Sequence, residues 1–231
     1  MFYLNSTYLM YMLPAMLLMM LTQWYVNSSY KKWSRVAARS GLTGAQTAQR
    51  LISIGGLYQV KIENVGGNLT DHYDPRIKTL RLSAGVAQSP SVAALAIAAH
   101  ELGHAMQDHE NYFLLRLRAA LVPAVNIGSY LGWILIFIGL ILRMTDLAWV
   151  GVLVFAGGAV FALATLPVEL NASSRARQLL SSSGIIVSEE EQRGVNRVLN
   201  AAALTYVAGL ITAIMQLLYF VSLVGGSSRR R

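Results

Sequence analysis

The stretch AAHELGHAMQ, residues 98–107, decides how the rest of this sequence is interpreted. If the segment is helical, a spacing of four residues places the His100 and His104 side chains one turn apart on one face. Two neutral imidazoles in this arrangement suit a zinc ion, at about 2.0–2.1 Å from each nitrogen. Glu101 follows the first histidine and is placed to act as a general base on a water at the metal. The motif therefore predicts a helix that carries a zinc-dependent hydrolytic site.

The composition indicates an integral membrane protein. The 231 residues are 55% hydrophobic and only 13% charged, with a mean hydropathy of +0.46, whereas a soluble domain carries about 25% charged residues. Four apolar stretches approach the roughly 20 residues that span a bilayer. They cover about 8–26, 119–142, 147–166 and 202–224.

These stretches predict the fold class and the domain organisation. We expect a mainly α-helical integral membrane protein, in which a four-span helical bundle joins a zincin-like cytoplasmic catalytic layer with a small β-hairpin. The whole chain, 1–231, is expected to form one membrane-embedded catalytic domain, whose catalytic segments are 40–118 and 167–201.

The absence of cysteine and the distribution of charge limit the metal sites and the partners that this chain can have. There is no cysteine, so disulfides and thiolate zinc sites are excluded, and a metal must rest on His, Asp or Glu. The net charge of +8 is carried largely by Lys and Arg that flank the apolar stretches, which indicates membrane topology and argues against nucleic acid as a partner.

The same charges predict the orientation. Eleven Lys and Arg lie in 27–118 and four in 167–201, whereas the loop between the second and third stretches has only Arg143. The positive-inside rule therefore places both larger segments in the cytoplasm and both termini outside. The three arginines at 229–231 oppose this orientation.

Capping and turn residues predict the elements around the motif. The segment TGAQ at 43–46 has the pattern of a capping box that opens a short helix. Ser89 followed by Pro90 predicts the start of the motif helix. Strands are expected near 60–65 and 77–82, paired as a hairpin, and either strand could align an extended substrate by pairing with it.

A catalytic zinc ion usually has three protein ligands, so a third is needed. Residues 111–145 contain no carboxylate, and His109 lies about 180° around the helix from the first histidine. Asp146 would lie across the membrane under the predicted topology. The first remaining candidate is Glu169, which follows the third apolar stretch and which the predicted topology returns to the membrane face of the two histidines. The acidic run at 189–191 competes with it, although helix capping accounts for that run.

Two segments resemble known families. HELGH with a later ELNAS at 169–173 is similar to the membrane gluzincins, including HtpX-type and CAAX prenyl endopeptidases, which carry a zinc-binding Glu in a Glu-x-x-Ala-Asp pattern. LTDHYDPR at 69–76, LRLS at 80–83 and the zinc helix together resemble more closely the YugP-type membrane zinc metallopeptidases of bacteria. The resemblance covers most of residues 40–200 and implies a zinc-dependent peptidase, without implying a substrate.

The resemblance also indicates supporting residues. Ser173 stands where the gluzincins carry an Asp, and that Asp is expected to orient a ligand histidine, so Ser173 should supply a weaker hydrogen bond there. Asn171 is a second candidate for such a contact. His72 and Tyr73 are candidate donors to the tetrahedral oxyanion.

The sequence thus predicts a zinc endopeptidase of a bacterial inner membrane, with its active site on the cytoplasmic side. One zinc ion per chain would be held by His100, His104 and Glu169, and Glu101 would take a proton from the attacking water and pass it to the leaving amine. The expected partners are the bilayer and a peptide or protein substrate that is itself membrane-associated.

The composition and the motif are also compatible with two other functions. A metal-binding membrane scaffold or quality-control partner without peptidase activity is the main alternative, and Glu101 argues against it because zinc binding alone needs no Glu at that position. A transporter is disfavoured, because the apolar stretches contain no intramembrane carboxylate except the terminal Glu169.

Overall fold

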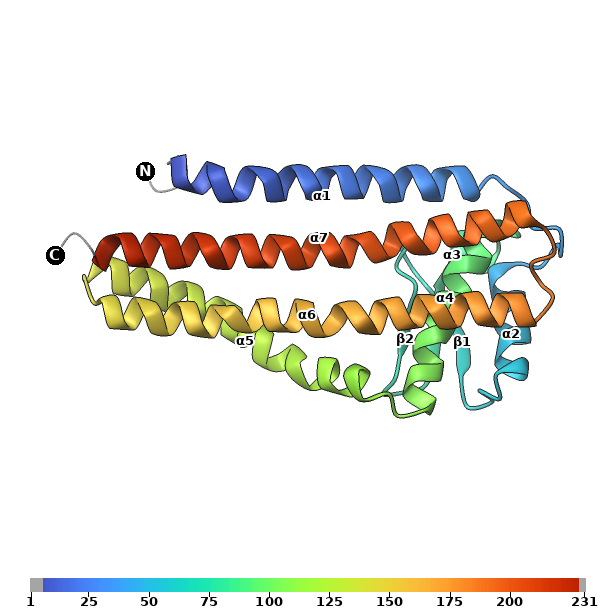
Figure 1. Ribbon diagram of the computed structural model, residues 1–231. Helices are drawn as coiled ribbons and strands as arrows, with labels where there is room; N and C mark the ends of the chain where they lie inside the picture. Colours follow the sequence, from blue (N-terminus) through green and yellow to red (C-terminus); the bar gives the residue numbers. More distant parts are fainter. Residues whose placement is uncertain (1–5, 229–231) are drawn as a thin grey trace. The chain divides into compact units, whose positions relative to one another are not determined.

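The computed structural model describes residues 6–228 (Figure 1), so the predicted role of the arginines at 229–231 in topology lies outside the described part. The helices are α1 (Ser6–Trp33), α2 (Gly44–Ile54), α3 (Ala84–Ala87), α4 (Val92–His109), α5 (Phe113–Ile141), α6 (Thr145–Ser182) and α7 (Glu189–Ser228). The strands are β1 (Lys61–Val65), β2 (His72–Asp74) and β3 (Thr79–Ser83). The fold is mainly α-helical with a small sheet, as the sequence predicts.

Four helices are long and apolar enough to cross a membrane: α1, α5, α6 and α7. The helices α1, α6 and α7 each contain one of the predicted apolar stretches and extend beyond it, and α5 begins earlier than the stretch 119–142 and ends one residue before it. The extension matters most in α6, which continues past the apolar stretch through Glu169 to Ser182. The third candidate ligand therefore lies on a regular helix, where its direction is fixed by the helix itself.

The chain falls into two compact units. The span unit consists of residues 1–22, 116–167 and 205–231, and the site unit consists of 23–115 and 168–204. Each of the four long helices contributes residues to both units.

A single apolar core joins the four helices of the span unit. Met12 of α1, Ile136 of α5, Val152 of α6 and Phe220 of α7 are all buried in it. The α5–α6 crossing is especially close, because a Cβ atom on Gly139 would lie 2.5 Å from the Ala148 nitrogen. Small residues at such crossings let apolar helices approach and gain van der Waals contact.

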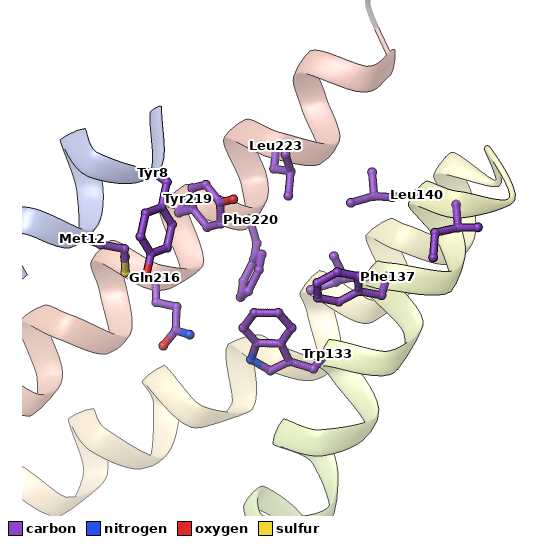
Figure 2. A pocket seen from close by; sticks show the side chains of 11 residues that line it. Tyr8, Met12, Trp133, Phe137, Leu140, Gln216, Tyr219, Phe220 and Leu223 are labelled. Atoms are coloured by element: carbon purple, nitrogen blue, oxygen red, sulfur yellow. The ribbon is translucent and has the colours of Figure 1, made fainter. Parts of the chain in front are cut away.

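The span unit also holds an apolar cavity of about 350 Å³, lined by residues of α1, α5 and α7. Figure 2 shows the rings of Trp133, Phe137 and Phe220 facing this space, with Gln216 nearby. Trp133 and Phe220 meet edge to face with ring centroids 4.9 Å apart, a favourable aromatic geometry.

The sheet of the site unit has the order β1–β3–β2, so β3 is the central strand. The predicted sheet is present, but the predicted hairpin between 60–65 and 77–82 is wrong, because β1 and β3 run parallel. The hairpin is formed instead by β2 and β3, which pair antiparallel with Tyr73 opposite Leu80. A parallel pair needs a crossover connection, and here that connection contains β2.

The core of the site unit is built around α4, which contacts α2, α3, β2 and β3. Its alanines bury almost completely, so its neighbours pack against the helix backbone. The N-cap is Ser91, whose hydroxyl accepts a hydrogen bond from the Ala94 nitrogen at 3.3 Å. The predicted start at Ser89 and Pro90 is two residues early, because the Pro90 carbonyl pairs with the Ala38 nitrogen at 2.8 Å.

Two other predicted caps are confirmed. Thr43 and Gln46 form the capping box of α2, and each side chain bonds the backbone nitrogen of the other residue. At the start of α7, Glu191 accepts from the Ser188 nitrogen at 3.0 Å and also from the Arg39 nitrogen at 2.8 Å. Glu191 is therefore engaged in backbone contacts, which removes it as a competitor for the metal.

Candidate metal centre

His100, His104 and Glu169 come together within the site unit, with their ligand atoms within 4.8 Å of one another. Nε2 of His100 lies 3.3 Å from Oε2 of Glu169, and Nε2 of His104 lies 3.4 Å from the same oxygen. Two ligands of a tetrahedral zinc ion, each at about 2.0–2.1 Å, are separated by about 3.3–3.4 Å. The spacing and the donor types therefore fit zinc.

Burial favours the same interpretation. The side chain of Glu169 is 2% exposed, and each histidine side chain is 12% exposed. A carboxylate buried to this extent needs a cationic or metal partner, because the loss of hydration is costly. Three protein ligands leave one tetrahedral position for a water or a substrate oxygen, as catalytic zinc sites require.

Gly103 brings the two halves of this cluster together. A Cβ atom at this position would lie 2.4 Å from the carbonyl oxygen of Ala172, so no larger residue fits between α4 and α6. Since Gly103 lies between the two histidines in sequence and Ala172 lies one turn after Glu169, the close approach sets the distance between the ligands. The glycine in HELGH is thus explained by packing.

Gln107 orients His104 by accepting a hydrogen bond from its imidazole. Its Oε1 lies 3.0 Å from Nδ1 of His104, and the side chain is fully buried. Its Nε2 donates to the Val168 carbonyl at 2.8 Å and to Oδ1 of Asn171 at 2.9 Å. Two acceptors on the nitrogen side fix the orientation of the amide, which leaves the oxygen facing the imidazole.

This orientation determines the tautomer of His104. An amide oxygen can only accept a hydrogen bond, so Nδ1 of His104 must carry the proton. The lone pair of Nε2 is then free and faces the Glu169 carboxylate, as a metal ligand requires. Gln107 was not predicted to have this role, although its position three residues after His104 on a helix is a usable signal.

Ser173 holds the other histidine. Its hydroxyl oxygen lies 3.2 Å from Nδ1 of His100, and the side chain is buried. A serine hydroxyl can accept from a protonated Nδ1, which again leaves Nε2 free. Both ligands are therefore oriented by neutral groups, an amide and a hydroxyl, where many zinc sites use a carboxylate.

Asn171 connects this arrangement to the protein surface. Its Oδ1 accepts from Gln107 and also from Nε of Arg175 at 2.7 Å. The Arg175 guanidinium in turn makes a bidentate pair with Glu110, at 2.6 and 2.7 Å. Hydrogen-bonded groups thus run from His104 to an exposed ion pair, and this network links α4 and its C-cap to α6.

Glu101 faces the edge strand of the sheet. Its Oε2 accepts a hydrogen bond from the backbone nitrogen of Tyr73 at 3.1 Å. Burial raises the pKa of the Glu101 carboxyl, although the nearby His100 and His104 lower it in part. A carboxylate with a raised pKa is a stronger proton acceptor, which is what a general base needs.

The candidate oxyanion donors are not held at the cluster. The Tyr73 hydroxyl donates to Asp108 at 2.8 Å, and Lys78 pairs with the same carboxylate. Burial raises the pKa of Tyr73, and the hydrogen bond to Asp108 raises it further, so this phenol stays neutral. The side chain of His72 is exposed, and its Nδ1 lies 2.8 Å from the Thr70 carbonyl oxygen.

The comparisons with known proteins agree with this geometry. A family described as "Putative neutral zinc metallopeptidase" matches residues 8–225. The chain is 47% identical over 199 residues to the "Putative membrane protease YugP" of Bacillus subtilis (strain 168), covering 86% of this chain and 88% of that protein. No solved structure matches the chain. By the extent of these matches and by its HELGH helix, the chain belongs to the neutral zinc metallopeptidase family.

Proposed function

We propose that the protein is a membrane zinc endopeptidase that binds one zinc ion per chain through His100, His104 and Glu169. The observation that carries this proposal is the convergence of both histidine Nε2 atoms on a single oxygen of Glu169, at 3.3 and 3.4 Å. Convergent neutral nitrogens on a buried carboxylate oxygen are suited to a shared metal ion.

The role proposed for Glu101 is general base and then general acid. Zinc bound at this site would supply Lewis-acid chemistry, which acidifies a water molecule and polarises the scissile carbonyl. Glu101 takes the proton from the attacking water and returns it to the leaving amine. Its hydrogen bond from the Tyr73 nitrogen holds the carboxylate beside the reaction space.

We infer that an extended substrate lies along β2. The central strand β3 has both edges paired, so the predicted use of 77–82 for substrate alignment is wrong. Both β1 and β2 are edge strands, and β2 is the one that touches Glu101. Tyr73 is the middle residue of β2; its N–H is held by Glu101, and its carbonyl, on the same outward edge, could accept a hydrogen bond from a peptide added as a strand.

The experiment that tests the function compares wild type with Glu101→Gln in detergent, using casein as the substrate and quantifying bound zinc. Loss of the base should reduce the cleavage rate by about 10²–10⁴-fold while zinc is retained. Glu190→Gln, an exposed carboxamide substitution on α7, is the matched control and should cleave normally. If Glu101→Gln cleaves as fast as wild type, the measured cleavage does not use Glu101 and the proposed mechanism fails; if wild type binds zinc but cleaves no casein, the protein is a metal-binding scaffold.

We propose further that the site unit faces the bacterial cytoplasm. The chain has no cysteine, so a single introduced cysteine can report its side of the membrane. Tyr58→Cys, at a residue 77% exposed in the site unit, should react with an impermeant thiol reagent only after cells are opened. Leu142→Cys, in the turn between α5 and α6 that the proposed topology places outside, should react in intact cells, and the reverse pattern would invert the proposed topology.

A further inference from the structure

A second cavity, of about 570 Å³, lies in the site unit between the end of α1 and the start of α7. We call it the basic cavity. The lining residues on which its chemistry depends are Lys32, Trp33, Arg193, Asn196, Arg197 and Asn200. None of them belongs to the metal cluster or its supporting hydrogen bonds.

Three cations line the basic cavity, and no carboxylate lines it. Within the described part of the chain, Lys32, Arg193 and Arg197 make no ion pair with an Asp or Glu. Lys32 lies over the Trp33 ring and Arg197 over the Tyr25 ring, each 5.1 Å from the ring centroid. These contacts hold the charges at the wall without neutralising them.

The two asparagines add donors and no free acceptors. Arg177 donates to Oδ1 of Asn196 at 3.0 Å and to Oδ1 of Asn200 at 2.6 Å. A guanidinium has only donors, so both amide oxygens must face Arg177. The NH₂ group of each asparagine is therefore directed elsewhere and remains available to an acceptor.

Trp33 forms part of the rigid wall of the basic cavity. Its side chain is 7% exposed, and the ring is fixed by Gly194, where a Cβ atom would lie 2.5 Å from the indole. The cations and amide N–H groups held on this wall are suited to an anionic acceptor.

The position of the basic cavity indicates which molecule would supply an acceptor to it. The basic cavity lies where the apolar stretch 8–26 ends and where the stretch 202–224 is about to begin, and Trp24 and Tyr25 also line it. Aromatic residues at the ends of spans mark the level of the lipid headgroups. Basic pockets between spanning helices at this level suit anionic headgroups.

We propose that the basic cavity binds the phosphodiester group of an anionic phospholipid. A phosphodiester offers oxygen acceptors and one negative charge, and it matches a lining of cations and amide N–H groups. The glycerol and acyl chains continue into the bilayer beside the apolar parts of α1 and α7. This proposal does not depend on zinc or on peptidase activity.

The test measures phosphatidylglycerol bound to the purified full-length protein by native mass spectrometry from mixed phosphatidylcholine and phosphatidylglycerol micelles. The variant Lys32→Gln/Arg193→Gln/Arg197→Gln should lose affinity by about fivefold for each charge, and so by about a hundredfold in total. The control Lys31→Gln/Arg35→Gln/Arg50→Gln removes the same charge from exposed positions outside the cavity and should bind as wild type does.

Two outcomes would overturn the proposal. If both triple variants lose phosphatidylglycerol equally, the attraction is a general effect of net charge. If inorganic phosphate, titrated calorimetrically in phosphatidylcholine alone, binds as tightly as the lipid, the cavity takes a soluble phosphate. Circular dichroism and zinc content, which should match wild type in both variants, show that the fold is preserved.

Discussion

The two parts of α6 use the same close backbone contact for different purposes. In the span unit, a Cβ atom on Gly139 of α5 would lie 2.5 Å from the Ala148 nitrogen of α6. In the site unit, a Cβ atom on Gly103 of α4 would lie 2.4 Å from the Ala172 carbonyl. The first contact packs apolar helices, and the second brings hydrogen-bonding groups of Glu169 and its neighbours within reach of α4. Close approach thus stabilises one region and sets ligand geometry in the other.

Among substitutions in the two parts of α6, Glu169→Gln is expected to have the largest effect on zinc content and casein cleavage. The amide removes the negative ligand, so zinc should be lost and casein cleavage should fall to background, while helix content stays unchanged. Thr165→Val is the counterpart one turn earlier in the span unit, where the buried hydroxyl has no hydrogen-bond partner in the described structure. It should keep zinc and activity. Full zinc occupancy in Glu169→Gln would disprove the ligand assignment.

Two glycine substitutions, one in each unit, test directly whether the two close helix contacts have different roles. Gly103→Ala should separate α4 from α6 and abolish stoichiometric zinc binding, measured by elemental analysis of the purified protein. Gly139→Ala should lower the free energy of unfolding by about 1–3 kcal/mol through overpacking, with zinc unchanged. If Gly139→Ala also released zinc, the two contacts would not be separable in function.

A smaller effect is expected when a histidine loses its supporting group. Gln107→Leu should weaken zinc affinity by about 10–100-fold, because nothing then fixes the Nδ1 proton of His104. Ser173→Ala should weaken it less, since a single hydroxyl contact is lost. Competition with a chromogenic chelator measures both, and wild-type affinity in Gln107→Leu would show that packing alone orients His104.

The smallest effect on stability is expected at the exposed Arg175–Glu110 ion pair, where the hydrogen-bonded groups that begin at His104 reach the surface. The hydrogen bond from Arg175 holds the pKa of Glu110 below its ordinary value. A lowered folded-state pKa means that the pair stabilises the protein above the ordinary carboxyl pKa of about 4.3 and loses this effect as the pH falls through the folded value. Glu110→Gln should therefore cost less than about 1 kcal/mol at neutral pH and nothing in acid, as thermal unfolding can measure.

The sequence predicted the cluster of His100, His104 and Glu169 because the chemistry of a metal site leaves few choices of residue. Glu169 could be found by elimination, since a 35-residue stretch (111–145) without a carboxylate follows the motif helix. The close approach at Gly103 could not be predicted, because the hydrophobic pattern of a helix does not tell which backbone packs against a glycine. The orientation of Gln107 could not be predicted either, since it depends on Asn171 and on the Val168 carbonyl, more than sixty residues away.

The sheet shows a second limit of prediction from the sequence. The residues of β1 and β3 were identified as strands from their apolar residues, but local patterns do not distinguish parallel from antiparallel pairing. The three residues of β2 are too few for a periodic signal, and His72 and Asp74 resemble turn residues in composition. The edge strand β2 beside Glu101 is therefore not predicted from the sequence, although its residues lie in the segment 69–76 that resembles the family.

The separation of the ligands along the chain has a consequence for biosynthesis. His100 and His104 are synthesised 65 and more residues before Glu169, and α5 and the apolar part of α6 lie between them. A nascent chain therefore holds two ligands while both middle spans still await insertion, and tight zinc binding requires the third. We expect a ribosome-stalled chain ending before residue 169 to retain no zinc, so that the protein would acquire its metal only after its membrane insertion is well advanced.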